Sequence, residues 1–184
     1  MNSDEATVAV IEAIEASQIS YMLVGSLSSN YYGVSRSTKD ADFVIELGDK
    51  RITSVMETLP SAFRLNPQIT FETIPGTVRY IIDVNEIPFR IEMFRLGDDP
   101  HDQERFARRS RVFVPQFQRQ AFIPRVEDVI VTKLRWQRGK DRDDVRDMIA
   151  VQADAIDWEY VHRWSDLHGT RELLDEIRSS IPPI

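Results

Sequence analysis

The sequence predicts an α+β fold, in which a mixed sheet flanked by helices is followed by a mainly helical second half. Apolar and polar residues alternate in three segments of the first hundred residues, which is typical of strands. These segments are 69–74, 77–84 and 87–94. Beyond Val126, apolar residues recur every three or four positions, as they do in amphipathic helices. A turn rich in Gly, Asp and Pro at 96–100 separates the two parts.

The turn at 96–100 predicts a core over residues 1–100 and a region with a hairpin and helices over 101–184. Before the three segments above, the expected elements are a helix over 7–16, a strand over 19–24, a helix over 27–32 that a left-handed Gly33 closes, a strand over 40–47 and a helix over 50–59. The segments 77–84 and 87–94 are expected to pair as an antiparallel hairpin. The later elements are a hairpin of 111–117 with 121–124 and helices over 126–136, 142–151, 158–167 and 171–177.

The composition disfavours several classes of protein. Cysteine is absent, so no disulfide framework, thiolate–zinc site or cysteine nucleophile is available, which fits a reducing cytoplasm. No apolar run approaches bilayer length, and the N-terminus lacks the pattern of a signal peptide, so we expect a cytoplasmic protein that does not bind membranes. The net charge of −7 disfavours strong general binding to nucleic acid, which requires a basic surface.

Asp40 and Asp42 are the first candidates for chemistry. Residues two apart in a strand project from the same face, so both carboxylates of Asp40-Ala41-Asp42 aim at one point. Two converging anions repel unless a cation compensates them. Hard oxygen ligands of this kind suit Mg²⁺ or Mn²⁺, whereas the alternative is a pair of solvated aspartates at the start of a strand.

Gly25-Ser26 follows the preceding strand and comes directly before a helix. The start of a helix offers free backbone N–H groups, and glycine lets the main chain approach a phosphate closely. The Ser26 hydroxyl adds a further donor, although serine is also an ordinary helix cap. The two motifs together predict a phosphate cradle and a metal platform on adjacent strands.

These motifs resemble a known family. The segment 21–26, Gly33 and the segment 36–43 are similar to the signature of the DNA polymerase β-like nucleotidyltransferase superfamily. Within that superfamily the chain resembles the small prokaryotic proteins of the AbiEii and MNT type, many of which are linked to toxin–antitoxin or phage-defence systems. The segments 126–134 and 139–145 are similar to the C-terminal pattern of the same group.

The resemblance implies the nucleotidyltransferase fold and the transfer of NMP from an NTP to a hydroxyl group, with release of pyrophosphate. Asp40 and Asp42 would bridge two Mg²⁺ or Mn²⁺ ions, one that holds the triphosphate and one that activates the attacking hydroxyl. The acceptor is left open between an RNA end, a protein side chain and a small molecule. The alternative is an inactive relative that binds nucleotide or a cognate partner protein.

A third carboxylate usually completes such a site from a neighbouring strand. Glu92 is the candidate by position, although the family more usually has aspartate there, and this difference keeps the inactive alternative open. Asp83 on the partner strand is the second choice. The alternative interpretation of Glu92 is a charged residue on the solvent-facing side of an edge strand.

Four further residues are candidates for contacts with the nucleotide. Arg36 and Lys39 precede the two aspartates, where they would contact phosphate or offset the negative charge. Lys133 lies on an apolar helix, so its ammonium is expected at the rim of that face, near the triphosphate. Asp144 belongs to a polar cluster with a role in nucleotide binding or helix capping.

The histidines and tryptophans are not expected to take part. The histidines His101, His162 and His168 are too dispersed for a zinc site and are expected at the surface or at helix caps. The tryptophans Trp136, Trp158 and Trp164 are expected to be core or interface residues rather than stacking platforms for bases.

Overall fold

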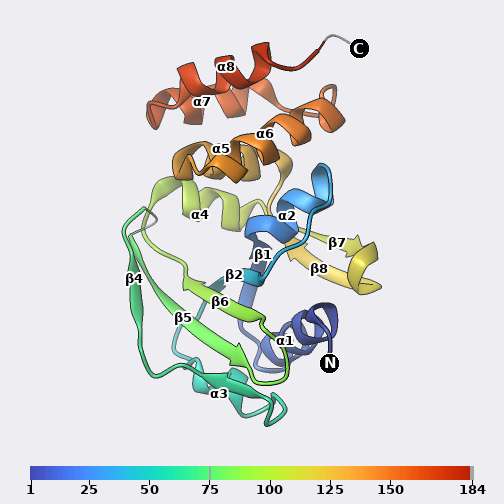
Figure 1. Ribbon diagram of the computed structural model, residues 1–184. Helices are drawn as coiled ribbons and strands as arrows, with labels where there is room; N and C mark the ends of the chain where they lie inside the picture. The colour runs from blue at the N-terminus through green and yellow to red at the C-terminus, as the bar shows by residue number, and fades with distance from the viewer. Residues whose placement is uncertain (75, 183–184) are drawn as a thin grey trace.

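The structure is a computed structural model, which describes residues 1–74 and 76–182. Figure 1 shows a sheet with helices around it and a group of helices, α5 to α8, at one end of the molecule. The strands of the larger sheet are β1 (Ser20–Val24), β2 (Asp40–Glu46), β3 (Phe63–Leu65), β4 (Thr70–Glu72), β5 (Thr77–Val84) and β6 (Arg90–Arg95).

The order of the strands determines which side chains meet. Within the described residues, the sheet runs β1-β2-β6-β5-β3, and β4 also pairs with β5. β2 and β6 are parallel and the other neighbours are antiparallel, so the sheet is mixed, as predicted. The register places Val24 opposite Asp42, and Asp42 opposite Glu92. The end of β1 and the middle of β6 therefore lie on either side of the same aspartate.

Four helices accompany the sheet and four follow the hairpin in the described part of the chain. The first set is α1 (Ser3–Ala16), α2 (Gly25–Tyr32), α3 (Thr53–Met56) and α4 (Pro100–Ala107). The hairpin and the second set are β7 (Ser110–Val114), the 3₁₀ turn η1 (Pro115–Phe117), β8 (Arg119–Ile123), α5 (Val126–Trp136), α6 (Gly139–Gln152), α7 (Trp158–Leu167) and α8 (Arg171–Ser179). None of the helices among residues 1–74 and 76–182 combines the length and apolar character needed to cross a membrane.

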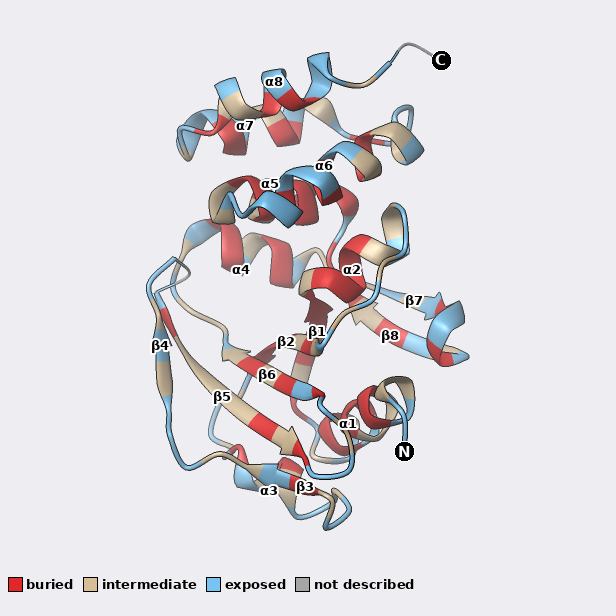
Figure 2. Ribbon diagram, in the orientation of Figure 1, coloured by how far each residue is buried: buried red, intermediate tan, exposed pale blue. Residues whose placement is uncertain are grey.

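Buried apolar side chains form two main clusters. The larger one joins α1, the sheet and the β7–β8 hairpin, and includes Ile14, Phe43 and Ile123. The other joins the helices α5 to α8, and Figure 2 shows buried stretches along all four of them. The hairpin thus packs with the sheet, and the purely helical cluster begins at Val126. The division of the chain at residue 100 stays a prediction, and residues 183–184 of its second region lie outside the described part.

Most of the predicted elements are present, including the antiparallel pair of β5 and β6. Three local predictions are wrong, namely those for the helix over 50–59, for Gly33 and for His101. The helix expected over 50–59 is reduced to the single turn of α3, and Gly33 has φ −123° rather than a left-handed conformation. The run at 96–100 is a turn that also starts a helix, because the Asp99 side chain accepts hydrogen bonds from the backbone N–H groups of His101 and Asp102. His101 is fully buried there, not at the surface.

Candidate active site

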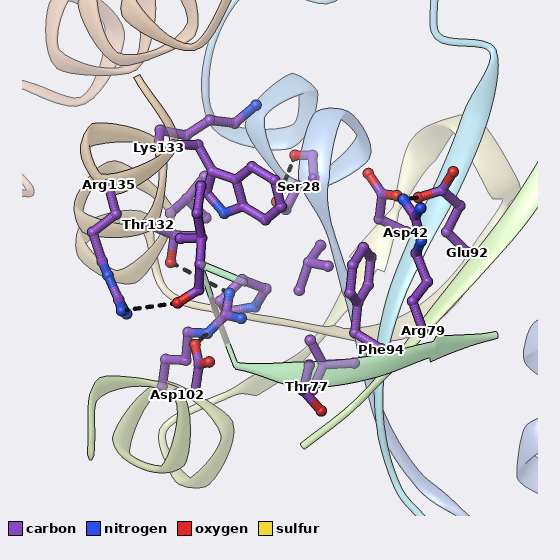
Figure 3. Close-up of a pocket in the computed structure, with 18 of the residues that line it drawn as sticks. Ser28, Asp42, Thr77, Arg79, Glu92, Phe94, Asp102, Thr132, Lys133 and Arg135 are labelled. Carbon is purple, nitrogen blue, oxygen red and sulfur yellow. Dashed lines mark hydrogen bonds and ion pairs between the residues drawn. The ribbon is translucent and has the colours of Figure 1, made fainter. Parts of the chain in front are cut away.

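A cavity of about 220 Å³ lies where the sheet meets α2, α4, α5 and α6. Figure 3 shows Asp42 and Glu92 on one side of it and Asp102 and Thr132 on the opposite side. Five of the predicted site residues line this cavity: Gly25, Asp40, Asp42, Glu92 and Lys133. The other four do not line it: Ser26, Arg36, Lys39 and Asp144.

Gly25 brings the start of α2 against the side chain of Asp42. Its φ of +64° lies in the left-handed region that favours glycine. A Cβ added at this position would overlap Oδ2 of Asp42. The main chain therefore approaches the carboxylate more closely than any other residue type would permit, and the first-turn N–H groups of α2 stay beside the cavity.

Ser26 does not face the cavity. The helix begins at Gly25, so Ser26 lies inside the first turn, where its hydroxyl accepts a hydrogen bond from Nη2 of Arg36 at 2.9 Å. Ser28 lines the cavity instead. Two positions along a helix differ in direction by about 200°, so Ser26 and Ser28 point to opposite sides. Ser28 was not predicted as a site residue because the helix starts at Gly25, two residues before the predicted start.

Glu92, and not Asp83, is the third carboxylate of the cavity. It lies opposite Asp42 in the parallel pairing of β2 and β6. Its Oε2 accepts a hydrogen bond from Nη1 of Arg79 at 2.9 Å, and Arg79 also contacts Glu72. Asp83 is nearly half exposed and pairs with Arg90, away from the cavity.

The charges around Asp42 are poorly compensated. Burial, then the charge of Asp40 and then that of Glu92 raise the pKa of Asp42 to about 7, although Lys133 and Lys140 act in the opposite direction. Oδ1 of Asp40 accepts a hydrogen bond from the hydroxyl of a nearby threonine at 2.6 Å. Neither aspartate forms an ion pair with any described lysine or arginine. Asp40 and Asp42 are thus left without an ion-paired protein cation, whereas Glu92 is paired with Arg79.

This donor set fits a hard divalent cation. Carboxylate oxygens are the ligands that Mg²⁺ and Mn²⁺ prefer, and the raised pKa of Asp42 shows the electrostatic cost that a cation would relieve. Asp40 and Asp42 are the side chains that would hold it. In the described ranges, no three carboxylate or imidazole side chains already lie close enough together to hold a metal ion. Glu92, bound to Arg79, is therefore not yet assembled with the two aspartates.

Lys133 and Asp144 belong to a second charged cluster beside the cavity. Nζ of Lys133 donates to Asp141 at 3.0 Å and to Asp144 at 2.6 Å. Arg36 donates two hydrogen bonds to Asp144, of 2.8 and 2.9 Å, and Arg138 donates to Asp141. Lys133 is only 4% exposed, so the expectation of an ammonium at the rim of the helix is wrong. The two buried aspartates hold it inside.

Lys39 is exposed and does not line the cavity. Several lining residues were not predicted as site residues, among them Arg79, Asp102, Arg105, Thr132 and Trp136. The signal for the last two was present in the sequence, because Val129, Thr132 and Trp136 recur at helical spacing on one face of α5. Arg79, Asp102 and Arg105 could not be predicted in this way, because their place in the cavity depends on how the strands and α4 pack.

Comparison with known proteins identifies the family of this chain. Residues 5–171 match the family described as a nucleotidyltransferase of unknown function (DUF6036). The chain belongs to this nucleotidyltransferase family. The match covers both the sheet and the greater part of the helical half, so it includes every lining residue of the cavity. No curated protein matches the chain in sequence.

Solved structures show the same fold at low sequence identity. The antibiotic-resistance factor ANT(2'')-Ia is 13% identical with a TM-score of 0.62, over 96% of each chain. An antigenic nucleotidyltransferase-like protein from Paracoccidioides brasiliensis is 16% identical with a TM-score of 0.57, over 99% of this chain and 94% of that one. The lincosamide adenylyltransferase LnuA, bound to lincomycin, is 12% identical with a TM-score of 0.51, over 82% and 98%. The nucleotidyltransferase fold is therefore shared with adenylyltransferases of antibiotics.

Proposed function

We propose that this protein transfers a nucleoside monophosphate from an NTP to a hydroxyl group in a reaction that requires Mg²⁺ or Mn²⁺. One observation carries the proposal: the Asp42 carboxylate packs against the Gly25 backbone and lies opposite Glu92, in a cavity that Asp40 also lines. A metal platform thereby adjoins the free amides at the start of a helix. Membership of a nucleotidyltransferase family supports the same chemistry.

In this reaction the bond between the α-phosphorus and the bridging oxygen of pyrophosphate breaks as the acceptor oxygen bonds to that phosphorus. The proton of the acceptor hydroxyl passes to solvent. The first-turn amides after Gly25 and the ammonium of Lys140 provide donors for the triphosphate, whereas the Ser28 hydroxyl already donates to the Gly25 carbonyl at 2.9 Å. A bound Mg²⁺ or Mn²⁺ would neutralise phosphate charge and lower the pKa of the attacking hydroxyl. Asp40 and Asp42 would hold that ion in place.

The acceptor is proposed to be a small molecule with a hydroxyl group. ANT(2'')-Ia has been solved with adenylyl-2''-tobramycin, and LnuA with lincomycin, so relatives of this fold act on or bind compounds of that size. An RNA end and a protein side chain stay open as acceptors. The AbiEii and MNT subtype, a cytoplasmic location, a toxin–antitoxin context and a cognate partner protein stay predictions.

A second candidate is a nucleotide-binding relative without transferase activity. The ion pair of Glu92 with Arg79 favours it, because it keeps the third carboxylate bound to a protein cation. In this case Asp40 and Asp42 would still hold a metal with its nucleotide, and no label would reach an acceptor.

The test is transfer of label from each NTP, labelled at the α-phosphate, with Mg²⁺ and a cell extract as the source of acceptors. We expect transfer by the wild type and loss of at least about 100-fold in Asp40→Asn/Asp42→Asn. Asp83→Asn is the matched control, since it removes a carboxylate of the same sheet that lies outside the cavity. NTP binding without any transfer would favour the second candidate, and neither binding nor transfer would overturn both.

A further inference from the structure

Trp136 lies in the cavity rather than in the core. It is half-buried at the C-terminal end of α5, lines the cavity and belongs to neither of the two main apolar clusters. The guanidinium carbon of Arg138 lies 4.8 Å from the centre of its ring. An aromatic face that the core does not use, next to a cation in a cavity, is the arrangement that stacks on a flat ligand.

A buried ion pair lines the same cavity. Asp102 and Arg105 of α4 are 4% and 6% exposed, and Nε of Arg105 lies 2.8 Å from Oδ1 of Asp102. Nη1 of Arg105 donates to the Thr132 hydroxyl at 3.3 Å. Oδ2 of Asp102 and Nη2 of Arg105 have no hydrogen-bond partner among residues 1–74 and 76–182. This pair therefore keeps one acceptor and one donor available at the cavity wall.

The aromatic face and the polar pair lie close together. Thr132 and Trp136 are four residues apart on α5, so their side chains lie on one face of the helix, separated by about one turn. Thr132 also contacts Arg105. In Figure 3, Thr132 and Asp102 lie across the cavity from Asp42 and Glu92. A ligand that reaches from the carboxylates to this wall would meet the ring and then the pair.

We propose that this wall, formed by Trp136, Thr132, Asp102 and Arg105, binds the base of the NTP. A nucleobase is flat and aromatic, and its edge carries both hydrogen-bond donors and acceptors. Its face stacks on Trp136, while its edge donates to Asp102 and accepts from Arg105. This assignment rests on the proposed function, because it requires the triphosphate to lie at Asp40 and Asp42.

The wall fits a base better than it fits the triphosphate or a polycationic acceptor. Lys140 and the α2 amides lie near the aspartates, where they suit phosphate. Phe94 of β6 lines that side too, where the guanidinium carbon of Arg79 lies 5.9 Å from the centre of its ring. Of the four residues of the wall, Asp102 is acidic and Arg105 is basic, and Arg135 and Arg138 line the cavity as well. A polycation would meet a single carboxylate of the wall, which is already paired with Arg105, whereas a neutral base meets both a donor and an acceptor.

The first experiment measures binding of each of the four NTPs and of inorganic tripolyphosphate, all with Mg²⁺, by calorimetry on the full chain. We expect the wild type to bind its preferred NTP about 10-fold or more tightly than tripolyphosphate, because stacking adds to the phosphate contacts. Trp136→Ala should remove this difference and leave the affinity for tripolyphosphate unchanged. Trp158→Ala, a half-buried tryptophan outside the cavity, should keep the difference.

The second experiment compares the ranking of the four NTPs. Asp102→Asn exchanges an acceptor for a donor, so we expect it to change the order of the four affinities. Thr132→Val is the milder variant, which keeps the shape of the side chain and releases Arg105 from its hydrogen bond. In Thr132→Val the ratio between the weakest and the tightest of the four Kd values should fall about 3-fold. This variant tests the role of the pair if Asp102→Asn does not fold.

The outcomes separate this inference from the proposed function. If the wild type binds neither tripolyphosphate nor any NTP, the proposed function fails. If it binds both and Trp136→Ala keeps the preference for NTP, the stacking role of the wall is overturned while the proposed function stands. If Asp102→Asn and Thr132→Val only lower thermal stability and keep the ranking and its spread, the pair holds α4 on α5 and does not read the base.

Discussion

Two groups of carboxylates in this protein differ in whether protein cations pair with them. Asp141 and Asp144 bind Lys133, Arg138 and Arg36 through short hydrogen bonds. Burial raises the pKa of Asp144, but the hydrogen bonds from Arg36 and Lys133 outweigh it and lower that pKa to about 2. Across the cavity, burial and like charges raise the pKa of Asp42 to about 7.

The difference indicates where the chain supplies its own cation and where it leaves one to be added. The paired cluster of Asp141 and Asp144 holds α2, α5 and α6 together, and its carboxylates are already bound to protein cations, so they are not free to bind a ligand. The unpaired carboxylates of Asp40 and Asp42 repel each other, which lowers the stability of the fold but favours binding of an added cation. The four predictions below perturb one cluster or the other, in order of decreasing effect.

Lys133→Met should have the largest effect, because it leaves two buried aspartates with fewer counter-charges. We expect the free energy of unfolding to fall by about 3 kcal/mol in urea. Lys140→Met is the matched control, since Lys140 lines the same cavity but is exposed, and it should change stability by less than about 0.5 kcal/mol. Equal losses in the two variants would contradict the distinction between a paired and an open cluster.

Gly25→Ala should be more harmful than Gly48→Ala. Both glycines have positive φ, at +64° and +59°, so both variants carry the same kind of backbone strain, about 1 kcal/mol. Only at Gly25 does the added Cβ overlap Asp42, whereas no atom lies within 4 Å at Gly48. Gly25→Ala should therefore lose about 1 kcal/mol more stability than Gly48→Ala and should weaken Mn²⁺ binding, measured by urea unfolding and calorimetry. Equal losses would show that Asp42 moves freely.

Asp42→Asn should stabilise the metal-free protein at pH 8. The folded-state pKa of Asp42 is raised, so the wild type is destabilised as pH rises from about 4, where the unfolded carboxylate ionises, to about 7. The asparagine variant escapes this loss, and in EDTA we expect it to be roughly 2 kcal/mol more stable than the wild type at pH 8 and less so at pH 5. Saturating Mn²⁺ should stabilise only the wild type. A gain that does not change with pH would contradict the raised pKa.

Arg79→Gln should have the smallest effect. Its ion pair with Glu92 is partly solvated, so the loss of stability should stay below about 1 kcal/mol. Glu92 would then be free to join Asp40 and Asp42, and the affinity for Mn²⁺ should rise about 2- to 5-fold. The double variant Arg79→Gln/Glu92→Gln should lose that gain. Unchanged affinity in Arg79→Gln would show that Glu92 is no metal ligand.

The aspartate pair and its neighbouring glycine were predictable from the sequence because they depend on local rules. Alternation along one strand directs Asp40 and Asp42 to the same side, and a glycine between a strand and a helix indicates a close approach of the main chain. Helical periodicity likewise predicted α5 to α8 with small errors at their ends.

The third carboxylate and the partners of the charged residues were decided only by the tertiary structure. Glu92 and Asp83 are both acidic residues of neighbouring strands, and only the parallel register of β2 with β6 places Glu92 opposite Asp42. Lys133 resembles any lysine on an apolar helix until α6 brings two aspartates to its ammonium. Periodicity determines the direction of a side chain relative to its own element, whereas its partner depends on which distant element packs against that face.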